Sequence, residues 1–170
     1  MSVCMTYHMN DGKSIPLALG RTEYYGGNTA IVAISPTDDG KDYELFAYLS
    51  CNLGESMYKR EFYLDDDIVD IRQDLSDANI ARETGILGYS RFHTHSLMRL
   101  SDAAYEQMDV INYNDAEPFA PMRDALFAYV NGEQSYEISE FVTELPMPES
   151  RTAIVENDGL DSDYEFDIPL

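Results

Sequence analysis

The sequence predicts an α+β fold, a small antiparallel sheet with a helix on one face, followed by an acidic α/β extension. Short segments rich in β-branched and aromatic residues alternate with Gly- and Asp-containing turns through the first hundred residues. Residues 68–80 instead carry apolar side chains at helical spacing. Beyond residue 100 basic residues almost disappear. At 170 residues the chain suits one domain with an appendage, so we expect a sheet domain at 1–100 and an acidic helical and strand extension at 101–170.

The first half of the sheet is predicted from four segments. Residues 2–9 form a strand that an Asn-Asp-Gly turn ends. Residues 15–19 form a short extended piece, which Pro16 keeps at a sheet edge because proline donates no backbone hydrogen bond. Residues 29–35 and 43–51 are two strands joined by a polar loop with an Asp-Gly turn. This pattern predicts a β-hairpin.

A strand and a helix follow. Residues 60–64 are predicted as a strand, and the aspartates at 65–67 suit the positive end of a helix at 68–80. Thr84-Gly85 is predicted to break the chain before a strand at 91–100. The apolar stripe of the helix consists of Ile68, Ile71, Leu75 and Ala78.

The extension is predicted to contain both helices and strands. Ser101 is placed to cap a helix that ends near Asn112. A second helix at 121–130 ends at an Asn-Gly pair. Residues 136–145 fit a strand or a helix, with the alternation of apolar and acidic residues favouring a strand, and residues 151–155 are predicted as a further strand.

Composition excludes several function classes. A net charge of −21 and a pI near 4.1 argue against direct binding to DNA, RNA or an anionic membrane, because phosphates would repel the chain. No apolar run approaches the length of a membrane helix, and the N-terminus has no apolar leader. Cys4 and Cys51 without an export signal predict reduced thiols in a bacterial cytoplasm. No cofactor motif is present, so no cofactor is expected.

The one spacing typical of a metal site is His93-Thr-His95. In a strand both side chains point to one face, as in zinc hydrolases. The sequence offers no patterned third ligand, and it contains no nucleophile motif and no phosphate-binding glycine loop. Ordinary strand histidines remain one reading, and a metal-dependent hydrolase remains an alternative function.

The extension concentrates negative charge. Residues 101–170 hold seventeen Asp/Glu against two Arg and no Lys, a net charge of −15, whereas residues 1–100 have a net charge of −6. At one phosphate charge per about 1.7 Å of duplex, −21 corresponds to about 36 Å of DNA. A compact chain of this length is about 40 Å across, so the two charge densities are similar. The carboxylates expected to bind a basic partner are Glu133, Glu137, Glu140, Glu144, Asp161, Asp163, Glu165 and Asp167.

Several segments carry a family resemblance. Residues 25–34 (YGGNTAIVAI), 47–53 (AYLSCNL), 61–64 (EFYL), Thr84-Gly85 and the strand that closes at Leu100 resemble a small uncharacterised domain family of phages, plasmids and other mobile elements. The match covers about residues 17–100 and implies a sheet-plus-helix domain.

Joined to the acidity, the mobile-element association is similar to that of anti-restriction and anti-CRISPR proteins that mimic DNA, by analogy of charge. We therefore expect a non-enzymatic inhibitor that occupies the basic nucleic-acid-binding channel of a host defence complex. The alternatives are the hydrolase built on the histidine pair and a structural or oligomerising accessory protein whose acidity only keeps it in solution.

Overall fold

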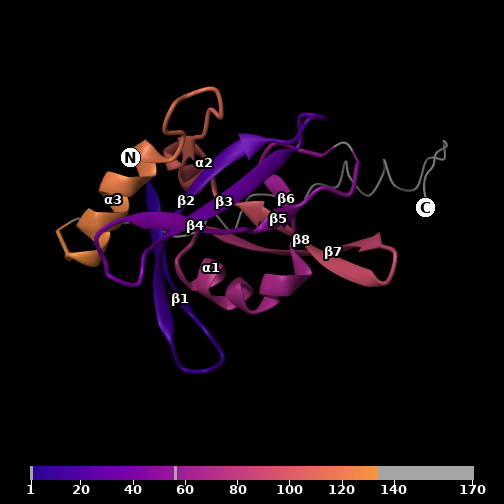
Figure 1. The fold of residues 1–170 in the computed structure, drawn as a ribbon. Helices are drawn as coiled ribbons and strands as arrows, with labels where there is room; N and C mark the ends of the chain where they lie inside the picture. The colour runs from indigo at the N-terminus through magenta and orange to yellow at the C-terminus, as the bar shows by residue number, and fades with distance from the viewer. Residues whose placement is uncertain (1, 56, 134–170) are drawn as a thin grey trace, which may run out of the picture.

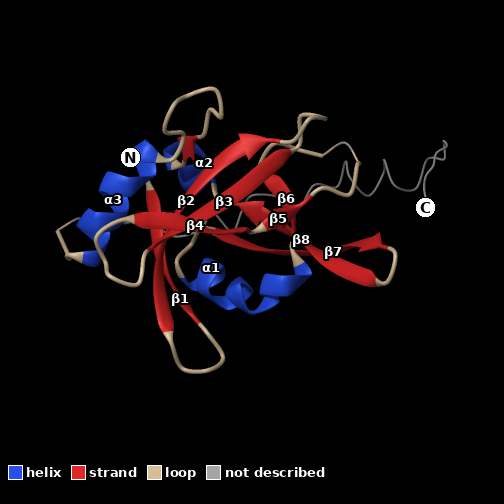
Figure 2. Cartoon of the chain, viewed as in Figure 1, coloured by secondary structure: helices blue, strands red, loops and turns tan. Residues whose placement is uncertain are grey.

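A computed structural model describes residues 2–55 and 57–133. These residues confirm the predicted α+β class: they form two antiparallel sheets and three short α-helices (Figures 1 and 2). Sheet A contains β1 (Val3–His8), β2 (Ser14–Glu23), β3 (Thr29–Pro36), β4 (Tyr43–Tyr48) and the short β9 (Asp109–Val110). Sheet B contains β5 (Ser50–Cys51), β6 (Glu61–Leu64), β8 (His93–Leu100) and β7 (Ala81–Ser90), in that spatial order. The helical segments are the 3-10 helix η1 (Asp66–Ile71) and the α-helices α1 (Arg72–Asp77), α2 (Asp102–Gln107) and α3 (Ala120–Val130).

Sheet A is the middle layer of the described structure. Alternate residues of its strands point to opposite faces. In β3, Ile31 and Ala33 join the core shared with sheet B and α1, whereas Val32 and Ile34 join the core under α3. Figure 1 shows α3 and α1 on different sides of the sheets. Because both faces are covered, β3 is an almost continuous apolar strand, which is typical of a buried layer.

The segment around Pro16 is longer and more central than predicted. β2 has ten residues and pairs with β1 on one side and β3 on the other. Pro16 lies opposite Thr6, in the part of β2 that precedes its pairing with β3, which begins at Ala18. The missing amide of Pro16 therefore falls where the sheet is locally an edge, and a central strand tolerates it there.

The predicted hairpin forms, but its second strand is divided between the sheets. β3 and β4 pair antiparallel. β4 ends at Tyr48, and Ser50 begins β5 in sheet B. Leu49, fully buried between them, donates its N–H to the Ile31 carbonyl at 2.8 Å and accepts the Asp65 N–H at 2.8 Å. Leu49 thus ties sheet A to sheet B.

The predicted break at Thr84-Gly85 is wrong, because both residues lie inside β7. Gly85 has φ of +87°, and the pairing of β7 with β8 shifts register between Glu83 and Leu87. The Thr84 hydroxyl donates to the Leu97 carbonyl at 3.0 Å and so holds this irregularity against β8. A glycine with positive φ here makes a bulge within a strand, not an end to it.

The helix predicted at 68–80 is shorter and begins earlier. It starts as η1, kinks at Ile68, and continues as α1 only to Asp77. The Asp65 side chain caps it by accepting the Asp67 N–H at 2.9 Å. Its apolar stripe is buried as predicted through Leu75.

The helices beyond residue 100 differ in how well they were predicted. Ser101 caps α2 by accepting the Ala104 N–H at 3.1 Å, as expected. The helix ends at Gln107 and not near Asn112, because the next residues form β9 parallel to β2. The helix predicted at 121–130 is confirmed as α3, which packs against sheet A. The strands predicted at 136–145 and 151–155 lie outside the described residues, and the division of the chain at residue 100 stays a prediction.

Candidate protein-binding surface

Of the eight carboxylates predicted to bind a partner, the structure describes one. Glu133 follows α3, is exposed, and donates its backbone N–H to the Ala128 carbonyl at 2.9 Å. The other seven lie outside the described residues, so their grouping on one surface stays a prediction: Glu137, Glu140, Glu144, Asp161, Asp163, Glu165 and Asp167.

The described residues carry a second acidic surface, on η1 and α1. Asp67, Asp70, Asp74 and Asp77 follow one another at intervals of three and four residues, and beyond the kink at Ile68 this spacing places the last three along one side of the helix. Sequence reasoning recognised the apolar stripe of this helix and gave its first aspartates only a capping role, although the acidic stripe was visible at the same spacing. Together with Asp65 and with Asp11 in the β1–β2 turn, these residues are called the aspartate face.

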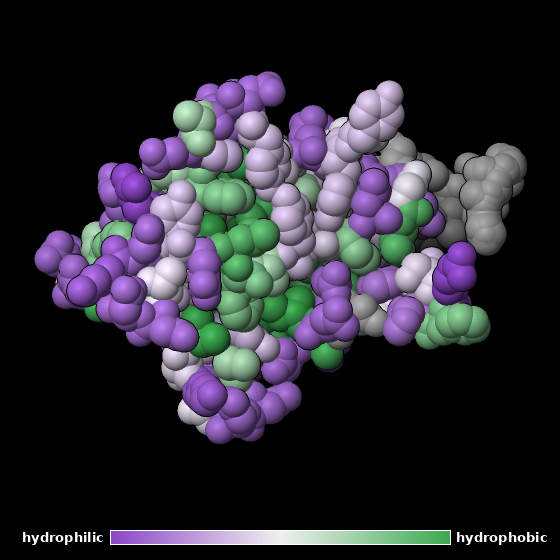
Figure 3. Space-filling model, viewed as in Figure 1, coloured by the Kyte–Doolittle hydropathy of each residue, from purple (hydrophilic) through white to green (hydrophobic). Residues whose placement is uncertain are grey.

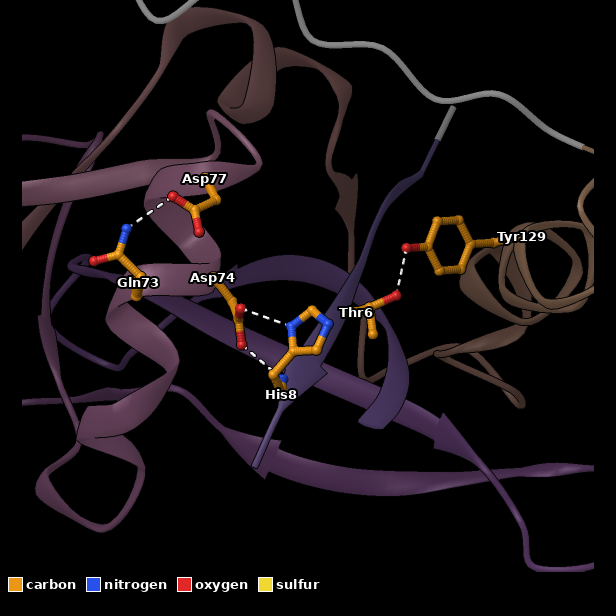
Figure 4. A network of polar contacts seen from close by, with 6 residues as sticks. All are labelled: Thr6, His8, Gln73, Asp74, Asp77 and Tyr129. Carbon is orange, nitrogen blue, oxygen red and sulfur yellow. Dashed lines mark hydrogen bonds and ion pairs between the residues drawn. The ribbon is translucent and has the colours of Figure 1, made fainter. Parts of the chain in front are cut away.

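Strand β1 holds two members of the aspartate face in place. The Tyr7 hydroxyl donates to the Asp70 carboxylate at 2.5 Å. Asp74 accepts the backbone N–H of His8 at 2.7 Å and lies 2.9 Å from the His8 Nδ1 atom (Figure 4). These contacts join α1 to β1 and leave the Asp74 side chain only 12 % exposed, so the exposed carboxylates of the face are those of Asp11, Asp67 and Asp77, while Asp70 and Asp74 add their charge from beneath.

Another side chain of the same strand contacts α3. The Thr6 hydroxyl lies 2.7 Å from the Tyr129 hydroxyl, and Figure 4 shows the His8 and Thr6 contacts directed to different helices. On α1 itself, the Gln73 amide donates to Asp77 at 2.8 Å. Strand β1 therefore connects α1 and α3.

The negative charge of the aspartate face affects the pKa of Tyr7. Burial raises the pKa of the Tyr7 phenol, and the hydrogen bond to Asp70 and the charges of Asp70, Asp74 and Asp11 raise it further. Two basic residues form ion pairs close by: Arg72 with Glu83 at 3.0 Å and Lys13 with Asp11 at 3.9 Å. Six aspartates against these two cations leave the face strongly negative.

An apolar groove adjoins the aspartate face. Strands β1 and β4 are opposite edges of the four-strand path of sheet A, yet the Tyr7 and Phe46 rings lie only 5.9 Å apart, edge to face. The sheet therefore curls until its edges approach each other. The space between β1, β4 and η1 has a volume of about 420 Å³. Its lining residues are Tyr7, Met9, Phe46, Ala47, Tyr48, Asp65, Asp67 and Ile68.

The groove combines aromatic walls with two carboxylates, those of Asp65 and Asp67, at its helical end. Tyr7 and Ile68 are buried, Phe46 is half-buried, and Tyr48 is 37 % exposed. Asp67 is exposed at the start of the helix. Figure 3 shows hydrophobic residues gathered near the middle of this side of the molecule, with hydrophilic residues around them.

The histidine pair has a different setting. His95 is 5 % exposed, and its Nδ1 lies 3.1 Å from the Leu64 carbonyl and 3.4 Å from Cys51 Sγ. Because a carbonyl oxygen only accepts hydrogen bonds, Nδ1 must carry the hydrogen that it shares with Leu64. In the neutral ring Nε2 then accepts a hydrogen bond from the Ser90 hydroxyl, which lies 2.8 Å away. The His93 ring is exposed, 6.5 Å from that of His95.

A metal at this pair would have to displace a hydrogen bond of His95. Within residues 2–55 and 57–133, no three His, Cys, Asp or Glu side chains are placed to hold a metal ion together. The hydrolase built on His93 and His95 stays a hypothesis, for which the described residues supply no third ligand.

Comparisons with protein-family models, with curated proteins and with solved structures found no match to this chain. The resemblance to a mobile-element domain family therefore stays a prediction. In the part of the chain that the structure describes, no helix combines the length and the apolar character that crossing a membrane requires.

Proposed function

We propose that this protein is a non-enzymatic inhibitor that binds the basic nucleic-acid-binding channel of a host defence complex, of the anti-CRISPR or anti-restriction type, by offering carboxylates in place of phosphates. The observation that supports this most is the row of aspartates along η1 and α1, held on a packed surface. A channel lined by Arg and Lys pairs with such a row through charge-assisted hydrogen bonds.

The spacing of the row is of the right order for a phosphate mimic. At a rise of about 2.0 Å per residue in the 3-10 helix η1 and about 1.5 Å in α1, the ten steps from Asp67 to Asp77 span about 17 Å. Four carboxylates over that length are about 6 Å apart along the axis, compared with one phosphate per about 3.4 Å along a single DNA strand. The seven acids outside the described residues would extend this charge if they gather nearby.

The first step of the test identifies a partner. The tagged protein is incubated with bacterial lysate at low salt, and retained nucleic-acid-binding proteins are purified. Displacement of a labelled duplex from each is then measured by fluorescence anisotropy. We expect the protein and the duplex to exclude each other, and the affinity to fall as NaCl is raised.

A pair of charge-matched variants tests the location of the site. Asp67→Lys/Asp77→Lys reverses two charges on the aspartate face, whereas Glu117→Lys/Asp124→Lys reverses two exposed carboxylates on and before α3. Both variants have the same net charge. The first should displace the duplex at least tenfold less well, since two charge-assisted contacts are lost, and the second within about twofold of the unaltered protein.

Two results would contradict the proposal. A partner that binds the duplex and this protein at the same time would rule out mimicry. Equal losses in the two variants would show that net charge alone matters, which is the expectation for a protein whose acidity only keeps it in solution.

A further inference from the structure

The groove between β1, β4 and η1 differs from the aspartate face because its walls are mainly aromatic and aliphatic. We propose that it receives the side chain of one arginine of the protein that the aspartate face binds, an inference that rests on the proposed function. Phe46 and Tyr48 are alternate residues of β4 and both line the groove, while Asp65 and Asp67 lie at its helical end.

The aromatic walls favour a guanidinium. This group is planar and weakly hydrated, and it stacks on aromatic rings while its N–H groups bond to carboxylates. The protein already makes one such contact internally. The Arg21 guanidinium lies 4.0 Å from the centre of the Tyr105 ring, and its Nε donates to the Tyr105 carbonyl at 2.9 Å.

The acidic end excludes other occupants. An anion would be repelled by Asp65 and Asp67, and by Asp70 behind the Tyr7 hydroxyl. A neutral apolar side chain would take water from these carboxylates without replacing its hydrogen bonds, which is unfavourable. A lysine ammonium satisfies the charge but stacks poorly and remains strongly hydrated. Charge and shape together therefore select arginine.

The size of the groove leaves room for the backbone around that arginine. A volume of about 420 Å³ exceeds that of one side chain, so neighbouring residues of the partner enter as well. A short peptide with a central arginine is therefore a suitable probe.

The test is an NMR titration of the full-length protein, labelled with ¹⁵N, with three capped tripeptides, Gly-Arg-Gly, Gly-Lys-Gly and Gly-citrulline-Gly. Citrulline has the shape of arginine without its charge. We expect the arginine peptide to shift the amide signals of Met9, Ala47 and Ile68 in a saturable way. It should bind roughly threefold more tightly than the lysine peptide and about tenfold more tightly than the citrulline peptide.

Variants of the groove sharpen the test. Phe46→Leu retains an apolar wall without the aromatic ring, and Asp67→Asn removes one exposed charge. Each should weaken binding of the arginine peptide about fivefold, whereas Asp124→Asn, on α3 at the opposite face of sheet A, should leave it unchanged. If Phe46→Leu fails to fold, Asp67→Asn decides, because its side chain is exposed.

The outcomes separate this inference from the function on which it rests. Equal affinity for the arginine and citrulline peptides, or shifts confined to other residues, would overturn the arginine site. If the site fails while duplex displacement still depends on Asp67 and Asp77, the proposed function stands alone. If the arginine peptide binds as described but no duplex is displaced, the site stands and the proposed function is wrong.

Discussion

A buried thiol makes the stability of this protein sensitive to alkaline pH. Cys4 lies on β1 under α3 and is 3 % exposed, with its Sγ 3.7 Å from the Ala125 carbonyl. Burial, and to a smaller extent the charge of Asp109, raise the pKa of the Cys4 thiol from 9.0 to about 12. An ionised thiolate has no favourable environment in this part of the core.

The direction of the pH dependence follows from this difference. The thiol of the unfolded chain ionises near pH 9, whereas in the folded protein it stays protonated until about pH 12. The stabilisation is therefore complete below pH 9 and is lost as pH rises toward 12. Between pH 8 and pH 10 this one group should lower the free energy of unfolding by about 1.4 kcal/mol.

Urea unfolding at pH 8, 9 and 10 in a reducing buffer, followed by far-UV circular dichroism, measures this loss. The chain contains no Trp, and its thirteen Tyr begin to ionise in this range, so fluorescence is a poor probe. The matched variant is Cys4→Ala. It loses some stability at every pH because a buried atom is removed, but it lacks the thiol, so the unaltered protein should lose about 1.4 kcal/mol more than the variant from pH 8 to pH 10. Parallel pH profiles would refute the reasoning.

Three further predictions concern packing and capping. Ser101→Ala removes the cap on the Ala104 N–H and should lower the free energy of unfolding by about 1–2 kcal/mol in thermal or urea unfolding. Gly88→Ala places a Cβ 2.5 Å from the buried Tyr63 ring and should cost about 1–3 kcal/mol; an unchanged melting temperature would contradict this contact. Leu126→Ala opens a cavity between α3 and sheet A and should cost about 2–5 kcal/mol in urea unfolding, whereas a loss under 1 kcal/mol would mean that α3 does not pack as described.

Local chemistry made several elements predictable. The caps at Asp65 and Ser101 are side-chain-to-backbone contacts within three residues, so the sequence alone displays them. The turn after β1 is equally local, because Gly12 adopts φ of +92° where an Asn-Asp-Gly pattern anticipates it. α3 was recognisable from its apolar residues and the Asn-Gly pair at its end.

Features that depend on distant contacts were not predictable. A glycine such as Gly85 can end a strand or form a β-bulge within it. Which of the two occurs here depends on the pairing of β7 with β8, which the sequence does not show. The two-residue β9 exists because β2 lies beside it, and no pattern of its own marks it. The groove requires β1 and β4, some forty residues apart, to meet through the curl of sheet A. The spacing of the aspartate face is present in the sequence, but the packing of β1 against it depends on contacts between residues more than sixty positions apart.

The contact between His8 and Asp74 also bears on self-association. β1 is an edge strand of sheet A, and an unpaired amide on an edge invites a strand from another molecule to add to the sheet. The Asp74 carboxylate already accepts the His8 amide, and its negative charge repels the carbonyl oxygens of an incoming backbone. At this end of β1, α1 therefore also disfavours self-association by the addition of a strand from another molecule to sheet A.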